Sequence, residues 1–347
     1  LLAEKAEGWI VGLRLAALSM RVLSDDKAFA QRFGGTSSAL IVEYLLNEVL
    51  ARQSPEIQDF VLRTSVLDRF CAPLCEAVCW GEAPAPGSSS GTAVRATEIP
   101  AGRSQEIIDW IAEANLFVVP LDEEGKWYRY HHLFRDLLRP RLAKQYGTPV
   151  VSELHSRAGD WYAKNGLVDE ALDHLLAANQ QAAAASLVAR LRTQMLNQAR
   201  WSRLERWLRR FSPDVIDQYP DLLILKTWLL YHETRFAELP ASLERLEASL
   251  ARVALAPETL DYLQGEMDAV RSLLAYFAVD AQATIVHAQG SLEKTRPDLW
   301  IVRSLARLTL AGALQMQGDL PGAYAAIYDG LAHEEGSSPA FKATLLV

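Results

Sequence analysis

Residues 87–91 read GSSSG and formally match G-x-S-x-G, the turn that exposes a nucleophilic serine between a strand and a helix. That turn needs a buried strand before it and a helix after it. Here it lies in residues 81–103, a stretch rich in Gly, Ala, Pro and Ser that is typical of a flexible insertion. We therefore assign no catalytic residue, and a hydrolase stays an alternative that a generic ester assay would test.

The sequence also lacks G-x4-G-K-[ST], the loop that cradles nucleotide phosphates. The three cysteines, Cys71, Cys75 and Cys79, repeat every four residues and so fall on one helix face. A zinc site would need a fourth ligand and a chelating loop such as C-x2-C. We predict buried, reduced thiols, no metal site and no enzymatic activity in this chain.

Two features near the predicted hairpin could carry a function. His131 and His132 stand where a predicted strand meets a helix, and a histidine pair is by itself a weak signal that an ordinary junction, with one histidine packed and one solvated, would also explain. Four arginines make the same region locally basic: Arg129, Arg135, Arg139 and Arg141. However, residues 122–124 (DEE) would place acids at the hairpin tip, where phosphates would lie. We therefore expect no DNA contact here.

The second half of the chain is rich in aromatic residues at helical spacing, most of which should be core. A few could instead stack on a ligand at a concave surface. The candidates for binding an inducer are Trp228, Tyr231, Tyr262, Tyr276 and Trp300.

Length and composition describe the chain that must position these residues. It has 347 residues, half of them apolar, and a net charge of −8, which fits two or three globular domains and does not favour DNA binding as the main task. No apolar run reaches the roughly 18 residues of a membrane span, so we expect a cytoplasmic protein without membrane contact. Both ends read as helix without a start or stop signal, which predicts an internal fragment.

The periodicity of residues 38–147 predicts a winged-helix domain. Ser54-Pro55-Glu56 is a helix start, and Ser104 should cap another helix. Residues 116–131 read as two short strands around a turn, followed by a helix that Pro140 should kink or end.

Residues 148–347 read as helical pairs with a degenerate repeat. Small and aromatic residues occur at the packing positions of a tetratricopeptide repeat: Gly159, Tyr162, Gly166, Ala171 and Ala178. Echoes follow at Ala199–Leu204, Thr234–Leu239, Val279–Thr284 and Gly318–Ala323. The fold class is therefore mainly α: a winged-helix domain with one β-hairpin, followed by an α-α superhelix of TPR-like helical pairs.

Several segments resemble the large ATP-binding LuxR-family regulators of the MalT type. Residues 6–18 are similar to the family segment E-G-W-x-x-G-L-x-L-A-A-L. Residues 60–75 and 127–138 resemble the family's winged-helix region, and residues 154–167 resemble the start of its helical arm.

The resemblance implies a STAND-class signal-transduction ATPase. Residues 1–37 would end the helical lid of the nucleotide-binding module, 38–147 would be the winged-helix domain that locks ADP at rest, and 148–347 would be the arm and sensor. A winged-helix histidine touches the nucleotide in such proteins, and His131 and His132 are nearest to that role. The fragment itself would hold no cofactor, whereas the intact protein would bind ATP or ADP, self-associate, and bind DNA through a separate C-terminal domain.

The function predicted for this chain is the sensor portion of an ATP-dependent transcriptional activator, binding an inducer or partner on its repeats. The alternative is a passive helical-repeat scaffold that binds proteins and no small molecule.

Overall fold

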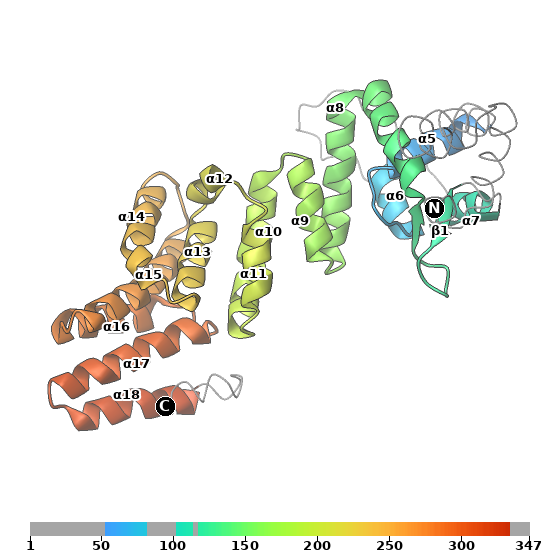
Figure 1. Cartoon of the computed structure of the whole chain (residues 1–347). Helices are drawn as coiled ribbons and strands as arrows, with labels where there is room; N and C mark the ends of the chain where they lie inside the picture. Colours follow the sequence, from blue (N-terminus) through green and yellow to red (C-terminus); the bar gives the residue numbers. More distant parts are fainter. Residues whose placement is uncertain (1–52, 82–101, 114–116, 334–347) are drawn as a thin grey trace, which may run out of the picture. The chain divides into compact units, whose positions relative to one another are not determined.

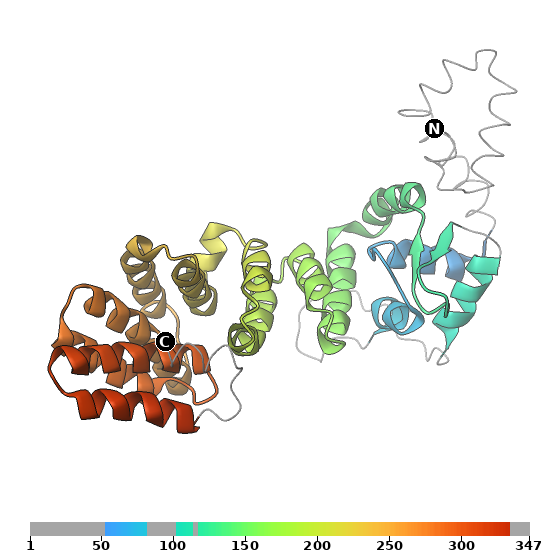
Figure 2. The same cartoon turned by 60° about the horizontal axis from the view of Figure 1, so that its bottom comes forward.

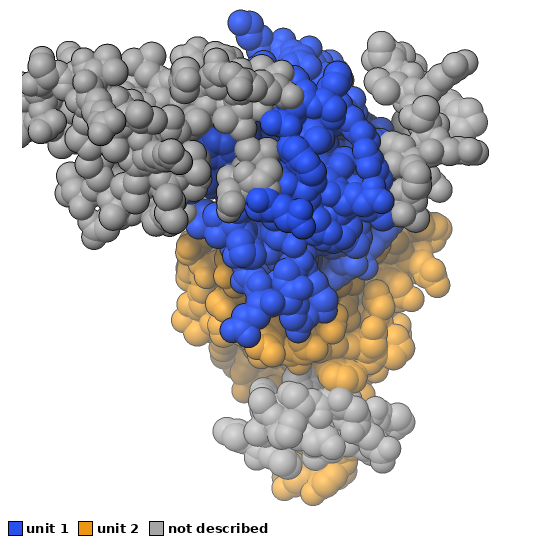
Figure 3. All heavy atoms as spheres, turned by 90° about the vertical axis from the view of Figure 1, so that its right-hand side faces the viewer, with its two compact units in different colours: residues 1–179 blue, residues 180–347 orange. Residues whose placement is uncertain are grey.

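The computed structural model describes residues 53–81, 102–113 and 117–333, and these are mainly helical, as the sequence predicts. The chain divides into two compact units, residues 1–179 and 180–347 (Figures 1 and 3). The predicted lid, residues 1–37, and the GSSSG motif lie outside the described residues.

The first unit contains α5 (Pro55–Thr64), α6 (Ala72–Trp80), α7 (Arg103–Glu113), β1 (Val118–Pro120), β2 (Tyr128–Tyr130), α8 (His132–Lys164) and α9 (Val168–Ala177). α5 starts as its sequence predicts, because the Ser54 hydroxyl accepts a bond from the Ile57 amide at 3.4 Å. The predicted cap Ser104 is wrong. α7 already begins at Arg103, which is paired with Glu56, and Ser104 lies fully buried in the first turn.

The wing is a short antiparallel hairpin in the register Val118↔Tyr130, Val119↔Arg129 and Pro120↔Tyr128. Phe70, between α5 and α6, adds a third piece of extended backbone through two bonds with Tyr128, at 2.7 and 2.8 Å. Its ring lies 4.7 Å from that of Tyr130, and Tyr130 in turn meets Phe134 of α8 edge-on. Aromatic packing thus joins the wing to helices before and after it.

α8 contains two prolines, and the prediction that Pro140 ends the helix is wrong. The residue with non-helical dihedral angles inside α8 is Gly147, at φ 77° and ψ 167°, two residues before Pro149. A conformation with positive φ suits glycine, and the residue before a proline is pushed out of the helical region, so the break falls in this Gly-Thr-Pro segment. The predicted domain boundary after residue 147 coincides with this break, whereas the first compact unit continues to Asn179.

The second unit is a succession of helices joined by short turns (Figures 1 and 2). They are α10 (Gln181–Asn197), α11 (Trp201–Leu208), α12 (Pro213–Gln218), α13 (Pro220–His232), the 3-10 helix η2 (Phe236–Glu238), α14 (Leu239–Leu250), α15 (Pro257–Phe277), α16 (Ala281–Lys294), α17 (Trp300–Met316) and α18 (Leu320–His333). Neighbours along the chain pack as pairs, most clearly α15 with α16, α16 with α17, and α17 with α18.

The degenerate repeat seen in the sequence marks the turns between helices. Its first positions adopt the left-handed conformation: Gly166, Ala199, Thr234, Val279 and Gly318, at φ between 52° and 82°. Each turn is closed by a backbone bond of the Schellman type, such as Arg200 N–H to Met195 O at 2.9 Å. Because only two of the five are glycines, the repeat is weak in sequence although its geometry is regular.

Glycine also sets the spacing within the pairs. A Cβ atom on Gly159 would lie 2.8 Å from the Leu175 side chain, so α8 and α9 can approach closely only without one. This is the small-residue role that the repeat pattern predicts for Gly159.

Candidate functional site

The histidine pair at the end of the wing is held tightly. His131 is the N-cap residue of α8 and is 3% exposed, and its ring stacks on that of His132 at 4.5 Å. Its amide donates to the Phe117 carbonyl at 2.7 Å, while its own carbonyl accepts from the amides of Phe134 and Arg135. His131 therefore joins the wing to α8, and the half-buried His132 is the more accessible of the two.

Two of the four arginines near the wing, Arg135 and Arg139, are used within the fold. The guanidinium groups of Arg135 and Arg139 both bond Asp68 at 2.9 Å, and Arg139 also donates to the carbonyls of Ser65 and Val66. These contacts cap the end of α5 and fix the following loop. Cations held in this way are less available to a phosphate backbone.

One of the acids at the hairpin tip, Asp122, shapes the turn. Both carboxylate oxygens of Asp122 accept hydrogen bonds from backbone amides, from Lys126 at 2.8 Å and Trp127 at 3.0 Å.

The wing also contacts the helical pair formed by α8 and α9. The Arg69 guanidinium lies 4.6 Å from the Trp127 ring and pairs with Glu170 of α9. Trp127 also meets Trp161 of α8 edge-on. We call these four side chains, Arg69, Trp127, Trp161 and Glu170, the wing latch.

The cysteines behave as buried small side chains. Cys71 is the N-cap residue of α6, and Cys75 and Cys79 lie on its inner face, all as free thiols. Burial raises the pKa of the Cys75 and Cys79 thiols, which makes them poor nucleophiles and poor metal ligands. The residues that the structure describes contain no cluster of metal-binding side chains.

Three of the five aromatic candidates, Trp228, Tyr231 and Tyr276, are linked by ring contacts that run through Phe236 and Phe277. Trp228 is fully buried and donates its indole N–H to Glu266 at 2.8 Å, and Tyr231 packs against it edge-on. Tyr262 lies under the Arg296 guanidinium, and the half-buried Tyr276 packs so close to Gly312 that no side chain would fit there. The half-buried Trp300 begins α17.

Two buried polar groups were missed by the sequence reasoning. In the second unit Arg192 of α10 donates to both carboxylate oxygens of Glu266 of α15, at 2.7 and 2.6 Å, and Glu266 is 1% exposed. In the first unit the Nδ1 atoms of His155 and His174 are 3.0 Å apart across the α8–α9 pair. Burial, and then the neighbouring His155, lower the pKa of His174 to about 4. The partners are far apart in sequence, so no local motif announces them.

A surface pocket of about 410 Å³ lies on the second unit, between α14, α15 and the end of α16. Its lining is Glu247, Leu250, Ala251, Leu260, Gln264, Met267, Asp268, Arg271 and Lys294. None of the five aromatic candidates belongs to this lining. In the sequence, the signal for this pocket would have been charged residues of both signs on neighbouring helix turns.

These elements define the class of the protein. The described part of the first unit has the three helices and wing of a winged-helix domain, latched to a helical hairpin, and the second unit continues as TPR-like helical pairs. None of the described helices is long and apolar enough to cross a membrane.

Comparison with known proteins identifies the winged-helix domain and proteins similar to this chain. Residues 46–150 match the family model described as the MalT winged helix domain. The HTH-type transcriptional regulator MalT of Yersinia enterocolitica is 27% identical over 275 residues, which are 79% of this chain and 28% of that protein. The MalT of Klebsiella pneumoniae is 26% identical over the same length. Residues 46–150 are therefore a MalT-type winged-helix domain, and most of the chain is similar to MalT, which confirms the resemblance read from the sequence.

A second kind of relative shares the same region. The serine/threonine-protein kinase PknK of Mycobacterium tuberculosis is 30% identical over 277 residues, or 80% of this chain and 23% of that protein. The chain thus spans about a quarter of the length of the curated relatives that it matches.

Proposed function

We propose that this chain is the regulatory part of a signal-responsive transcriptional regulator. In this proposal the helical pairs receive an inducer or a protein partner, and the winged-helix domain passes the signal on. The match of residues 46–150 and the MalT relatives support a regulator. The observation that carries the relay is the wing latch, because it joins the wing to the first helical pair, α8 and α9.

The mechanism follows from a shift between two states. A ligand that binds the open form better would release the winged-helix domain from the nucleotide-binding module of the intact protein, allowing ATP exchange and self-association. A shift from 1:99 to 99:1 requires about 5.5 kcal/mol of preference for the open form. DNA would be bound by a separate domain of the intact protein, and the protein would work in the cytoplasm.

The histidines at the wing give the nucleotide a candidate contact in this scheme. A buried His131 supports the backbone, so the half-buried His132 is the better placed of the two to meet a phosphate or base. The chain itself has no phosphate-binding loop, so we expect the purified chain not to hydrolyse ATP. Turnover above that of a mock preparation would contradict this expectation.

A thermal-shift screen of the purified chain against sugars, amino acids and other metabolites separates a sensor from a passive scaffold. A ligand that binds only the folded chain raises its melting temperature with a saturable concentration dependence. Such a hit supports sensing. Silence across the screen, together with specific capture of one protein partner by the chain, supports the scaffold and contradicts the sensor.

A further inference from the structure

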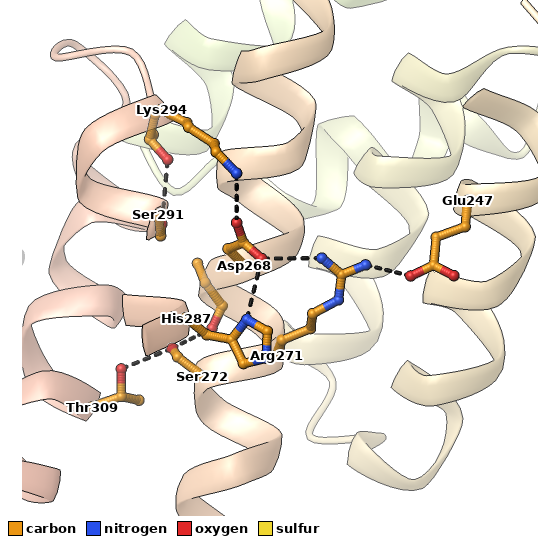
Figure 4. Close-up of polar contacts among 10 residues, drawn as sticks. Glu247, Asp268, Arg271, Ser272, His287, Ser291, Lys294 and Thr309 are labelled. Carbon is orange, nitrogen blue, oxygen red and sulfur yellow. Dashed lines mark hydrogen bonds and ion pairs between the residues drawn. The ribbon is translucent and has the colours of Figure 1, made fainter. Parts of the chain in front are cut away.

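The pocket on the second unit has one strongly charged wall. Asp268 of α15 is 8% exposed, and its carboxylate contacts Arg271 at 3.0 Å, His287 at 3.3 Å and Lys294 at 3.3 Å (Figure 4). Arg271 reaches across to α14, where it pairs with Glu247. The wall therefore carries two carboxylates and two permanent cations, contributed by three helices.

Close helix packing positions the wall. A Cβ atom on Gly290 of α16 would lie 3.3 Å from a carboxylate oxygen of Asp268, and one on Gly265 of α15 would lie 2.7 Å from the Thr295 amide. The absence of side chains at these two positions lets α15 and α16 approach closely. Asp268 is thus a positioning residue, which holds the cations of α15 and α16 at the pocket.

The charged groups at the rim remain accessible to a ligand. The side chains of Glu247, Lys294 and Arg271 are 54%, 38% and 28% exposed. An ammonium group has three N–H donors and a guanidinium has five, so each can bind a ligand as well as its carboxylate partner. Half-buried Leu250 and Leu260 and fully buried Met267 form the apolar side of the pocket.

The combination selects a class of ligand. A volume of about 410 Å³ suits a small molecule. No aromatic ring belongs to the lining, so the stacking face that a sugar ring uses is missing from it. A simple anion would meet the cations but also face Glu247 and Asp268. A molecule with one negative group, one positive group and an aliphatic chain satisfies both charges and the apolar side.

We infer that this pocket binds the zwitterion of a free α-amino acid with an aliphatic side chain. The ligand carboxylate lies at Arg271 and Lys294, its ammonium group at Glu247, and its side chain against Leu250 and Leu260. The inference rests on the proposed sensor function and names the class of inducer.

The test is titration calorimetry and thermal shift of the whole 347-residue chain with L-leucine, L-valine and L-methionine. At least one amino acid should bind saturably. For the one that binds, the analogue without the ammonium group and the analogue without the carboxylate should each bind about tenfold more weakly or worse, because each leaves charged pocket groups without a partner. For leucine these probes are 4-methylpentanoate and 3-methylbutylamine.

Matched variants locate the binding. Glu247→Gln and Lys294→Met, both at partly exposed positions, should weaken binding about tenfold. Glu244→Gln, on the exposed face of α14 one turn away, should leave it unchanged. Circular dichroism should show that all three variants remain folded.

Three results would overturn the inference: no amino acid binds, the carboxylate-only analogue binds as well as its amino acid, or Glu247→Gln and Lys294→Met both bind as the parent does. If another metabolite then gives a saturable shift, the sensor proposal survives without this ligand class. If nothing but a protein partner binds, both fail.

Discussion

The two units bury their polar groups in different ways. In the described part of the first unit the wing is joined to the helices mainly by aromatic rings, together with the Arg69 contacts of the wing latch and a hydroxyl contact between Thr64 and Tyr130 at 2.7 Å. The second unit encloses the pair Arg192–Glu266 and short hydroxyl contacts such as Thr227 to Ser242 at 2.8 Å.

The difference follows from the architecture of the units. A wing between helices has a distinctive shape, so ring packing suffices to fix it. Successive helical pairs resemble one another, so apolar side chains alone only weakly specify the register in which one pair packs on the next. A buried charged pair is costly unless its partner is in place, so it can select one arrangement. The following changes would break or sharpen this contrast, beginning with the largest effect.

Glu266→Gln should destabilise the second unit by about 3–5 kcal/mol, because it leaves the Arg192 cation buried with only a neutral partner and Asp221 at 3.5 Å. Hydrogen–deuterium exchange should rise in α10, α13 and α15 and stay unchanged in α8 and α9. The double variant Arg192→Met with Glu266→Gln, whose amide oxygen can still accept from the Trp228 indole, should recover most of the loss. Failure to recover would mean that the pair itself, rather than the removal of one partner, supports the unit.

Acid should weaken the first unit through His174. The unfolded histidine takes up a proton near its ordinary value of 6.5, whereas the folded one does so only at about 4. The unfolded state therefore binds more protons in this window, and stability falls by roughly 3 kcal/mol as the pH drops from about 6.5 to 4.

Urea unfolding across that pH range, followed by exchange in α8 and α9, measures this effect. His174→Leu should flatten the dependence, and His232→Gln, at an exposed position of the second unit, should not change it. An unaltered pH profile in His174→Leu would contradict the assignment.

Val279→Gly should stabilise the second unit by about 1 kcal/mol, because a β-branched residue that is 74% exposed occupies the left-handed region at φ 59°. The melting temperature should rise by about 2–4 °C. Val286→Gly, at an exposed position inside α16, should lower it, since glycine weakens a helix interior. If Val279→Gly lowered the melting temperature as Val286→Gly does, the turn would not be strained.

How far the sequence predicts the molecule depends on the range of each signal. The Ser54 cap and the hairpin of residues 116–131 are local patterns, and the structure confirms them. The family resemblance is likewise carried by contiguous segments. The prediction that Ser104 caps a helix failed because the contact of Arg103 with Glu56, 47 residues away, has no local signature in the sequence.

The candidate site was harder to predict than the fold. Aromatic residues were the natural ligand candidates, yet the Trp228 indole is committed to Glu266. The pocket instead joins charged residues of three helices, and their proximity follows from the close approach that Gly265 and Gly290 permit. Such a site depends on how helices pack, which periodicity does not specify.

Gly147 divides α8 into two rods with different partners. The first contacts α5 through Tyr146 and Asp59, and the second pairs with α9, where Ser152 donates to the Ala178 carbonyl. A movement of α9 can therefore reach the winged helix through the backbone of Gly147 and through the ion pair of Arg69 with Glu170. It can also pass through direct contacts of the second rod, Trp161 with Trp127 and the Tyr162 hydroxyl with the Arg69 carbonyl at 3.0 Å. Mechanically this is a pivot held by several contacts: while they hold, the two rods turn together, and once they open, Gly147 can take up the change of direction.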